Sequence, residues 1–345
     1  MPRHRPSPWS PERCQAVLWY SNPAARSWRT TPAPAEVLAF HQGLADYRPT
    51  PLREVPSLAD ELGVGRLLVK DESERLGLPA FKALGAWWAI HRAVEDHPEV
   101  VELVTATDGN HGRAVARRAA MLGLRSHIFI PDVVSDSAVE AIRAEGATVT
   151  IVADSYDAAV VAAASAATGR SLLIQDSAWP GYEVVPQHIV DGYSTLFREI
   201  DVQPDLVVVP MGVGSAAQAT VTHYRSGPVA PAVLGVEPAR ASCITSSLLA
   251  GQPVTVETST TVMAGLNCGT PSSLAWPVLR AGLDAAVTVE EAEALQAVRD
   301  LAAEGISSGA SGAATLAGLR NAREALDLTA SSTVILISTE AAPPV

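Results

Sequence analysis

The sequence predicts an α/β protein built on mainly parallel sheets, and two observations support this prediction. Short apolar runs bounded by turn residues alternate with amphipathic or alanine-rich segments along most of the 345 residues. Several runs end in polar or glycine-bearing loops, at the strand ends where parallel sheets carry their sites. The expected strands are 67–70, 102–106, 126–131, 148–153, 171–176, 206–212, 232–237 and 333–339.

Between these runs the apolar residues recur at helical spacing, which predicts helices. The last of the expected helices follows the apolar segment AVTV and has Glu290 and Glu291 in its first turn, where the helix dipole favours acidic side chains. The expected helices are 81–96, 111–123, 135–146 and 290–305.

Composition limits the possible partners and compartments. The length allows two domains, and the proline-rich residues 1–35 are expected to form an extended arm or a disordered tail. A formal charge of −12 argues against nucleic acid and anionic membranes as partners. No apolar stretch reaches the roughly 18–20 residues of a membrane span, and the N-terminus is not a secretory signal. Cys14, Cys243 and Cys268 have neither zinc spacing nor a disulfide framework, so we expect no metal site and a cytoplasmic protein.

Lysine is almost absent from the chain: Lys70 and Lys82 stand against 23 arginines. Arginine cannot replace lysine where an amine must lose its proton and attack a carbonyl. Lys82 lies where a Gly/Pro-bounded loop enters an apolar helix, and such amines form Schiff bases with carbonyls and with pyridoxal phosphate (PLP). The alternative is a surface lysine on a first helical turn. Lys70 ends an apolar strand beside Asp71 and Glu72, which predicts an ion-paired strand terminus.

A glycine loop, Gly212-Val213-Gly214-Ser215, follows one strand and precedes a helix. Glycines let the backbone approach an anion, and the N–H groups at a helix N-terminus point at it. A phosphate cup and a tight strand–helix turn both fit this pattern. A rival reading is a dinucleotide fingerprint, with Glu237 at the next strand end as the ribose-binding acid of a nucleotide-binding oxidoreductase.

Other candidate residues lie in the loops after three more strands. Asp108 and Asn110 follow one strand, Asp176 ends a second, and Ser338 closes the last. Polar groups on such turns suit contacts to a planar cofactor and to a reacting C–H or amine; helix capping and turn formation are the structural alternatives. His111 has no ligand-like spacing and is predicted to be structural.

Taken together, these residues resemble a known family. AFKALGA around Lys82, TDGNHG around Asn110 and GVGSA at 212–216 resemble the fold-type-II, tryptophan-synthase-β-like PLP enzymes. The segments YRPTPL, VKDES, QDSAWPGY and VMAGLNCGTPS look like the diaminopropionate ammonia-lyases within that class. The resemblance runs from about residue 20 to 340, and it implies two mainly parallel αβα domains with PLP in the cleft between them.

The resemblance also implies a role for each matching residue. Lys82 would hold PLP as a Schiff base, Asn110 would bond its 3′-oxygen, and Ser338 would lie near its ring nitrogen. Gly212, Val213, Gly214 and Ser215 would hold its phosphate.

The implied reaction is α,β-elimination of 2,3-diaminopropionate to pyruvate and two ammonia. Lys82 and Asp108 would remove the α-proton from opposite faces, and Asp176 would position or protonate the leaving amine. A dehydratase or β-replacement enzyme acting on serine, threonine or a modified 3-substituted alanine remains an alternative, as does a PLP-binding protein without catalysis.

The resemblance further implies a homodimer and an inserted domain. We expect a large domain at 36–97 and 172–345 and a small domain at 98–171. Trp87, Trp88, Ala310 and the short C-terminal segment depart from the family pattern, which bears on the substrate more than on the cofactor. Cys243 and Cys268 fall at cysteine positions of the family, and whether they pair is open.

Overall fold

A seven-stranded sheet forms the larger part of the molecule. The computed structural model describes residues 17–107, 109–153 and 156–343. Five central strands are parallel, and a short antiparallel strand lies at each edge. The strand order is β1 (Trp19–Ser21), β10 (Ala285–Val289), β9 (Ala232–Pro238), β8 (Leu206–Pro210), β11 (Thr333–Ser338), β3 (Arg66–Asp71) and β2 (Leu52–Glu54).

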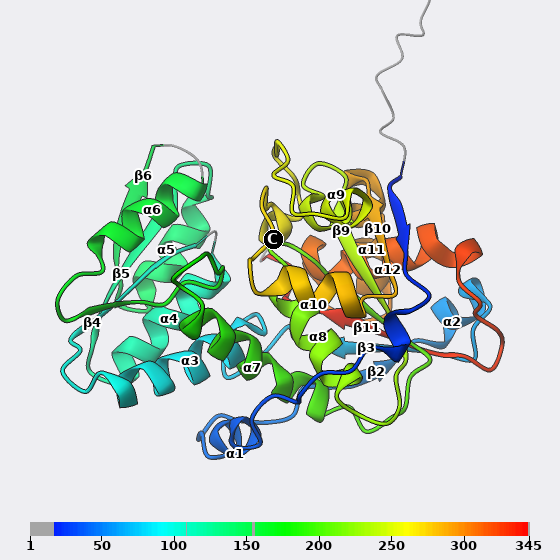
Figure 1. The fold of residues 1–345 in the computed structure, drawn as a ribbon, viewed down its shortest axis with the longest axis horizontal. Helices are drawn as coiled ribbons and strands as arrows, with labels where there is room; N and C mark the ends of the chain where they lie inside the picture. Colours follow the sequence, from blue (N-terminus) through cyan, green and yellow to red (C-terminus); the bar gives the residue numbers. More distant parts are fainter. Residues whose placement is uncertain (1–16, 108, 154–155, 344–345) are drawn as a thin grey trace, which may run out of the picture.

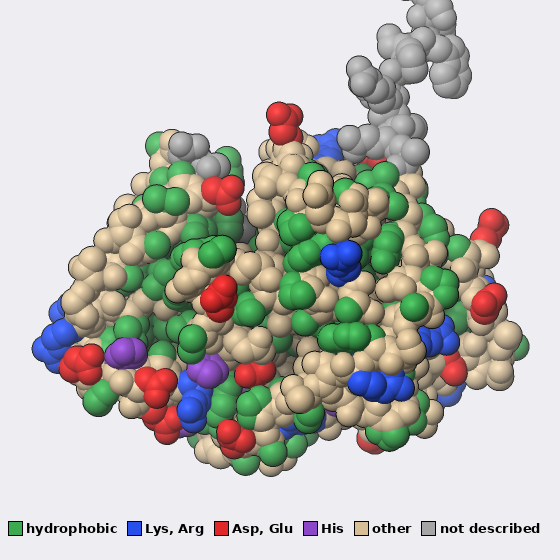
Figure 2. All heavy atoms as spheres, in the orientation of Figure 1, with side chains coloured by type: hydrophobic (Ala, Val, Ile, Leu, Met, Phe, Trp, Pro, Cys, Tyr) green, Lys and Arg blue, Asp and Glu red, His purple; other side chains and the backbone are tan. Residues whose placement is uncertain are grey.

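The second sheet has four strands and is wholly parallel. Its order is β6 (Thr148–Val152), β5 (Arg125–Pro131), β4 (Glu102–Ala106) and β7 (Ser171–Leu173). Figure 1 shows the two sheets as separate lobes, with α7 between them. On the face drawn in Figure 2 a notch separates the lobes, and Lys and Arg side chains are interspersed with Asp and Glu.

Helices cover both sheets and complete the αβα layers. They are α1 (Glu36–Gln42), α2 (Pro56–Leu62), α3 (Lys82–Asp96), α4 (Asn110–Met121), α5 (Asp136–Ala144), α6 (Tyr156–Ala166), α7 (Val184–Arg198), α8 (Ser215–Arg225), α9 (Cys243–Ala250), α10 (Ala275–Gly282), α11 (Glu291–Ala303) and α12 (Ala310–Ala322). Short 3₁₀ turns lie at Ala25–Ser27, Ala264–Leu266 and Arg323–Ala325. Within the described residues, no helix combines the length and apolarity that a membrane span requires.

Helices α3 and α7 approach each other closely because a glycine from each lies at their contact. A Cβ on Gly85 of α3 would lie 2.5 Å from Cε1 of Tyr193, and one on Gly192 of α7 would lie 2.5 Å from the Leu84 carbonyl oxygen. On its other side α3 is tied to α4, because the buried Trp87 indole donates to the Ala114 carbonyl at 2.9 Å. This packing positions the first residue of α3, Lys82.

All eight apolar runs contain strands, so the predicted α/β fold with mainly parallel sheets is confirmed. The edge strands β1 and β2 were not predicted, because three residues carry too little alternation. Strand β1 belongs to the expected N-terminal arm and pairs with β10, with Trp19 opposite Val287. Strand β7 pairs with β4, so residues 171–173 extend the four-stranded sheet beyond the expected boundary at 171.

Candidate active site

Lys82 stands at the start of α3, where two strands and a loop converge. The preceding loop is fixed to the end of the chain: the Phe81 N–H donates to the Thr339 carbonyl at 3.1 Å, and Ala80 forms an antiparallel bridge with Glu340. The Lys82 amine donates to Oδ2 of Asp176 at 2.7 Å. Burial alone would lower the pKa of Lys82, but the charge of Asp176, its hydrogen bond to the amine and the nearby Tyr193 together outweigh burial and hold the pKa above the ordinary lysine value.

Asp176 connects this lysine to the glycine loop. Its carbonyl accepts a hydrogen bond from the Ser215 hydroxyl at 3.0 Å, at the first residue of α8. The preceding residue, Gln175, is fully buried, and its side-chain oxygen accepts from the Ala106 N–H at 2.9 Å, which fixes the loop to β4. Burial would raise the pKa of Asp176, but the charge of Lys82 and the hydrogen bonds that the carboxylate accepts together lower it to about 2.

His111, on the first turn of α4, is buried beside Asp176. Its Nε2–H donates to the Ile174 carbonyl at 2.7 Å, which leaves Nδ1 as the unprotonated nitrogen of the neutral ring. That Nδ1 lies 4.0 Å from Oδ2 of Asp176 and has no hydrogen-bond partner among the described residues. His111 was predicted to be structural, but this placement puts it next to the candidate catalytic carboxylate.

Tyr193 of α7 is a site residue that the sequence did not indicate. Its ring packs against Phe81, with the ring centroids 4.5 Å apart. Its hydroxyl is buried without a hydrogen-bond partner in the described chain. Burial raises the pKa of Tyr193 to about 12, and the nearby charge of Lys82 opposes that rise. No local pattern marks this residue, because only the close α3–α7 contact brings it to the lysine.

The glycine loop between β8 and α8 has the form of an anion cradle. Gly214 has φ +102°, and a Cβ there would lie 2.9 Å from Cβ of Ala275, so the turn requires glycine. A Cβ on Gly212 would lie 3.1 Å from both Cys268 Sγ and the Gly265 carbonyl oxygen. Because α8 begins at Ser215, its first N–H groups are directed at this loop, as phosphate sites require.

Asn110 begins α4, and Ser338 ends β11 of the larger sheet. The Asn110 amide donates to Oε2 of Glu340 at 2.8 Å, which joins α4 to the residues after β11. The Ser338 hydroxyl is fully buried and donates to the Ser308 hydroxyl at 2.8 Å. Glu340 was not predicted as a site residue. The one feature of the sequence that could have indicated it is its position two residues after Ser338, a predicted site residue.

Glu340 also lies close to Ala310, one of the residues that the resemblance marks as a departure from the family pattern. A Cβ on Gly309, the residue before α12, would lie 2.8 Å from Oε1 of Glu340. An acidic group is therefore present at the start of α12, although it comes from residue 340. Burial raises the pKa of Glu340 above the ordinary value.

Most of the predicted site residues come together, while the rival reading does not hold. Lys82 touches Asp176, and Asp176 is bonded to Ser215 at the end of the glycine loop. Asp108 lies outside the described residues. Glu237 is fully buried, and its carboxylate accepts from the Ile244 N–H at 2.8 Å and from Thr245. This acid supports α9 and does not face a ribose, which contradicts the oxidoreductase alternative.

The two tryptophans that depart from the family pattern lie in the core. Trp87 and Trp88 are 1% and 2% exposed, and Trp88 packs edge-on against Phe40 of α1. They belong to the core and not to a substrate pocket. Cys243 is buried, and no disulfide joins it to Cys268 in the described part of the chain.

The residues present fit PLP, because this region combines one amine, a glycine cradle at a helix N-terminus and buried polar atoms that have no hydrogen-bond partner among the described residues. Besides His111 Nδ1 and Tyr193 Oη, those atoms include Asn267 Oδ1 and Ser311 Oγ. Each such atom is costly to bury without a hydrogen bond, so a polar planar ligand would be stabilised there.

Comparison with known proteins gives the same class. Residues 44–340 match the family model described as pyridoxal-phosphate dependent enzyme. The chain is 36% identical to the diaminopropionate ammonia-lyase of Salmonella typhimurium over 88% of both chains. It is also 36% identical to that of Escherichia coli K12, over 87% of this chain and 86% of the relative.

Solved structures agree with the sequence relatives. The crystal structure of diaminopropionate ammonia lyase from Escherichia coli, in complex with an aminoacrylate-PLP azomethine reaction intermediate, superposes with a TM-score of 0.86. The identity is 33%, and the match covers 94% of each chain. This chain belongs to the diaminopropionate ammonia-lyase family of PLP-dependent enzymes. The predicted fold type, lyase class and PLP cofactor are confirmed.

Proposed function

We propose that this chain catalyses the PLP-dependent α,β-elimination of 2,3-diaminopropionate to pyruvate and two ammonia. The observation that carries the proposal is the contact between the Lys82 amine and the Asp176 carboxylate at 2.7 Å. One group can exchange a proton at the substrate Cα, and the other can hold a proton for a leaving amine. The names of the relatives, which are diaminopropionate ammonia-lyases, support the same reaction.

We assign cofactor binding to the residues around the cleft. The backbone of Gly212, Val213, Gly214 and Ser215 would bind the phosphate. The Asn110 amide would donate to the cofactor's 3′-oxygen in place of Glu340. Ser338 would lie near the ring nitrogen. PLP, when bound, supplies an electron sink for the negative charge that develops at Cα. A hydroxyl at the ring nitrogen leaves that nitrogen unprotonated, which gives a moderate sink suited to elimination.

The proton transfers are then carried by side chains of this chain. In the cofactor-free protein the charge of Lys82 keeps Asp176 ionised. PLP bound at Lys82 would remove that charge, so the Asp176 carboxyl group would then be able to hold a proton. Lys82, once the substrate has displaced it, takes the α-proton, the β carbon–nitrogen bond breaks, and the departing amine receives the proton of Asp176. An amine is a poor leaving group unless it is protonated, so a carboxyl group at this place lowers the barrier. His111 Nδ1, 4.0 Å from Oδ2 of Asp176, is placed to accept a hydrogen bond from that carboxyl group once it is protonated. The enamine product hydrolyses to pyruvate and a second ammonia.

Asp108 completes the proposal as the base on the opposite face of the cofactor plane. With Lys82 on one face and Asp108 on the other, both enantiomers of diaminopropionate would react. Because Asp108 lies outside the described residues, this assignment depends on the sequence resemblance. Asp108→Asn should therefore impair one enantiomer far more than the other, and an equal loss for both would contradict a two-base mechanism.

We further propose a cytoplasmic homodimer with an inserted small domain at about 98–171 and a large domain formed by 36–97 and 172–345. The separate four-stranded sheet supports the division into domains. Sedimentation of the PLP-loaded protein would test the dimer.

The substrate is tested by offering the PLP-loaded protein D- and L-2,3-diaminopropionate beside D- and L-serine. We expect faster pyruvate release from diaminopropionate, with two ammonia for each pyruvate. Serine provides the control, since its elimination yields one ammonia for each pyruvate. Release from serine alone would leave the cofactor assignment in place and replace this proposal with a dehydratase.

A further inference from the structure

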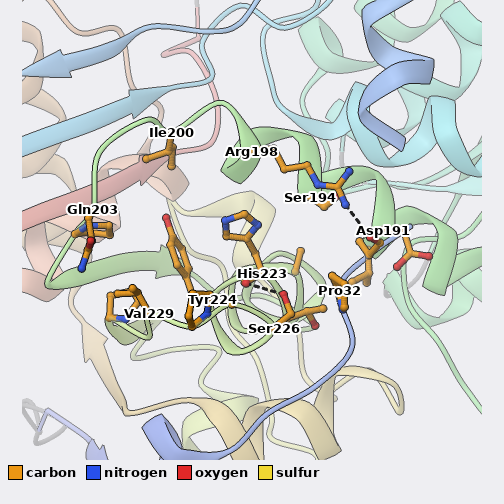
Figure 3. A pocket seen from close by; sticks show the side chains of 18 of the residues that line it. Pro32, Asp191, Ser194, Arg198, Ile200, Gln203, His223, Tyr224, Ser226 and Val229 are labelled. Atoms are coloured by element: carbon orange, nitrogen blue, oxygen red, sulfur yellow. Dashed lines mark hydrogen bonds between the residues drawn. The ribbon is translucent and has the colours of Figure 1, made fainter. Parts of the chain in front are cut away.

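A cavity of about 380 Å³ lies away from the candidate active site, between α7 and α8 (Figure 3). Its rim is formed by the loops 199–205 and 226–231, which lead into the amino ends of β8 and β9. The glycine loop and Asp176 follow the carboxyl ends of strands instead. The cavity therefore lies at the opposite edge of the sheet from the catalytic residues, and the proposed function does not use it.

Two opposite charges of α7 border this cavity. Asp191 and Arg198 are seven residues apart, which places them on one face of the helix (Figure 3). Neither forms an ion pair with any residue that the structure describes. Asp191 Oδ1 accepts only from the Gln187 amide, at 2.8 Å, and Arg198 donates to the neutral carbonyls of Ala33 and Pro34 at 2.7 and 3.0 Å.

The carboxyl group of Asp191 lacks a sufficient cation. It is only 8% exposed, and burial raises its pKa to about 6 even though Gln187 and Arg198 act in the opposite direction. A buried carboxylate whose surroundings supply too little positive charge is stabilised by a ligand ammonium.

Two buried hydroxyls along the cavity also lack partners. Ser194 of α7 and Tyr224 of α8 are 3% and 8% exposed, and neither Oγ nor Oη forms a hydrogen bond within the described chain. Figure 3 shows Asp191, Ser194 and Arg198 on one helix and His223 and Tyr224 across from them. Leaving such a group unpaired costs about 1–3 kcal/mol, which a polar ligand would recover.

The remaining walls are largely apolar and include Val190, Ile200, Val202, Ala219 and Pro231. We propose that this cavity binds a free amino acid with an apolar side chain. Its ammonium pairs with Asp191, its carboxylate pairs with Arg198, and the two hydroxyls bond to it. The apolar walls take the side chain, and the volume suits a ligand of this size.

Both helices that form the cavity continue to the catalytic residues. Tyr193, which reaches Lys82, lies between Asp191 and Ser194 in the sequence, and α8 begins at Ser215 beside Asp176. A ligand held between these helices therefore contacts the elements that position the lysine and the glycine loop. The site is suited to an amino acid that acts as an effector of the enzyme.

Calorimetric titration with L-leucine tests the proposal. The PLP-loaded protein is first reduced with borohydride, so that added amino acids cannot condense with the cofactor. We expect saturable binding of L-leucine and at least tenfold weaker binding of L-leucinamide, which lacks the carboxylate, and of N-acetyl-L-leucine, which lacks the ammonium. Equal binding of the three ligands would overturn the zwitterion assignment.

Variants locate the binding site. Asp191→Asn should weaken L-leucine binding at least tenfold, whereas Asp60→Asn, at an exposed carboxylate on α2 outside the cavity, should leave it unchanged. If Asp191→Asn fails to fold, the double variant Ser194→Ala/Tyr224→Phe, which changes no charge, should weaken binding instead. Absence of binding by leucine, valine, methionine and phenylalanine in either enantiomer would overturn the proposal. The proposal would also be overturned if these variants changed the oligomeric state of a protein that binds no amino acid. The cavity would then belong to a surface between copies of the chain.

Discussion

The two lysines of this chain make almost the same contact in very different surroundings. Lys70 lies 2.6 Å from Oε2 of Glu199, and Lys82 lies 2.7 Å from Oδ2 of Asp176. Around Lys70 the polar groups are paired. The amine also donates to the Thr50 carbonyl at 2.8 Å, and the Lys70 side chain is 1% exposed.

The carboxylate partner of Lys70 is equally well satisfied. Glu199 accepts two hydrogen bonds from Arg75, at 2.7 and 2.8 Å, and one from the Tyr47 hydroxyl at 2.9 Å. Around Lys82, by contrast, His111 Nδ1 and Tyr193 Oη lack partners within the described chain. The strength of an ion pair does not separate a structural lysine from a catalytic one. The unpaired polar atoms beside Lys82 distinguish the two lysines here, because such atoms are costly to bury and a bound ligand would offset that cost.

Removal of the Lys82 amine should have the largest effect on activity. Lys82→Ala takes away both the group that holds PLP and a base for the α-proton, so pyruvate release should fall by about 10⁴-fold or more. The measurement is pyruvate release from diaminopropionate, with circular dichroism to establish folding. The matched control is Lys70→Arg, which keeps the charge of the other lysine and should retain most of the activity. Substantial turnover by Lys82→Ala would contradict the assignment of Lys82, and not Lys70, to the reaction.

Asp176→Asn should have the next largest effect, because it keeps the shape of the side chain but holds no acidic proton. We expect kcat for diaminopropionate to fall by about 10²–10³-fold, with PLP still bound. Steady-state kinetics and the absorbance of the bound cofactor provide the measurement. A loss of less than tenfold would exclude Asp176 as the acid for the leaving amine.

At the other lysine the expected effect is on stability. Lys70→Met leaves Glu199 buried with one cation fewer, so the free energy of unfolding should fall by about 3 kcal/mol. Urea titration measures this change, while turnover for each folded molecule should remain close to that of the parent protein. A variant that is fully stable but inactive would place Lys70 in the chemistry and contradict its structural role.

The Lys82–Asp176 pair predicts a specific pH dependence for the cofactor-free protein. The pKa of Asp176 is lowered from 3.8 to about 2, so the folded state holds its carboxylate more strongly ionised than the unfolded state does. Its contribution to stability is therefore complete above pH 3.8 and disappears as the pH falls toward 2. The difference in unfolding free energy between the parent and Asp176→Asn should be flat from pH 5 to 8 and shrink below pH 4. A difference that grows as the pH falls would contradict the lowered pKa of Asp176 in the folded protein.

Tyr193→Phe should have the smallest effect. It removes the unpaired hydroxyl beside Lys82 but leaves the ring contact with Phe81, so folding should be unchanged. We expect kcat to fall by about tenfold, which corresponds to one hydrogen bond between this hydroxyl and the bound reactants, while KM changes little. The pH profile of kcat should shift as well, because the hydroxyl contributes to the environment of the amine. An unchanged rate and profile would assign Tyr193 to packing alone.

Local signals were enough to predict the fold and to identify the candidate reacting groups. Lys82 follows a Gly/Pro loop and opens a helix, and Asp176 ends an apolar run, so each position could be inferred from a short stretch of sequence. The glycine loop is recognisable for the same reason. Strand pairing adds that these loops converge on one cleft.

Contacts between distant elements could not be predicted in this way. Lys70 was expected to pair beside Asp71 and Glu72, but its partner is Glu199, at the end of α7. Tyr193 reaches the lysine only because Gly85 and Gly192 let two helices approach closely. The pairing of Asn110 with Glu340 spans 230 residues. Such contacts depend on packing in three dimensions, which no single segment encodes.

The most direct test is to locate the lysine that binds PLP. The PLP-loaded protein is reduced with borohydride and digested, and the peptides that contain Lys70 and Lys82 are compared by mass spectrometry. We predict that the cofactor mass lies on the Lys82 peptide alone, because only this amine faces unpaired polar groups and a glycine cradle. Cofactor on the Lys70 peptide, or on neither peptide in a protein that retains bound PLP, would contradict the account.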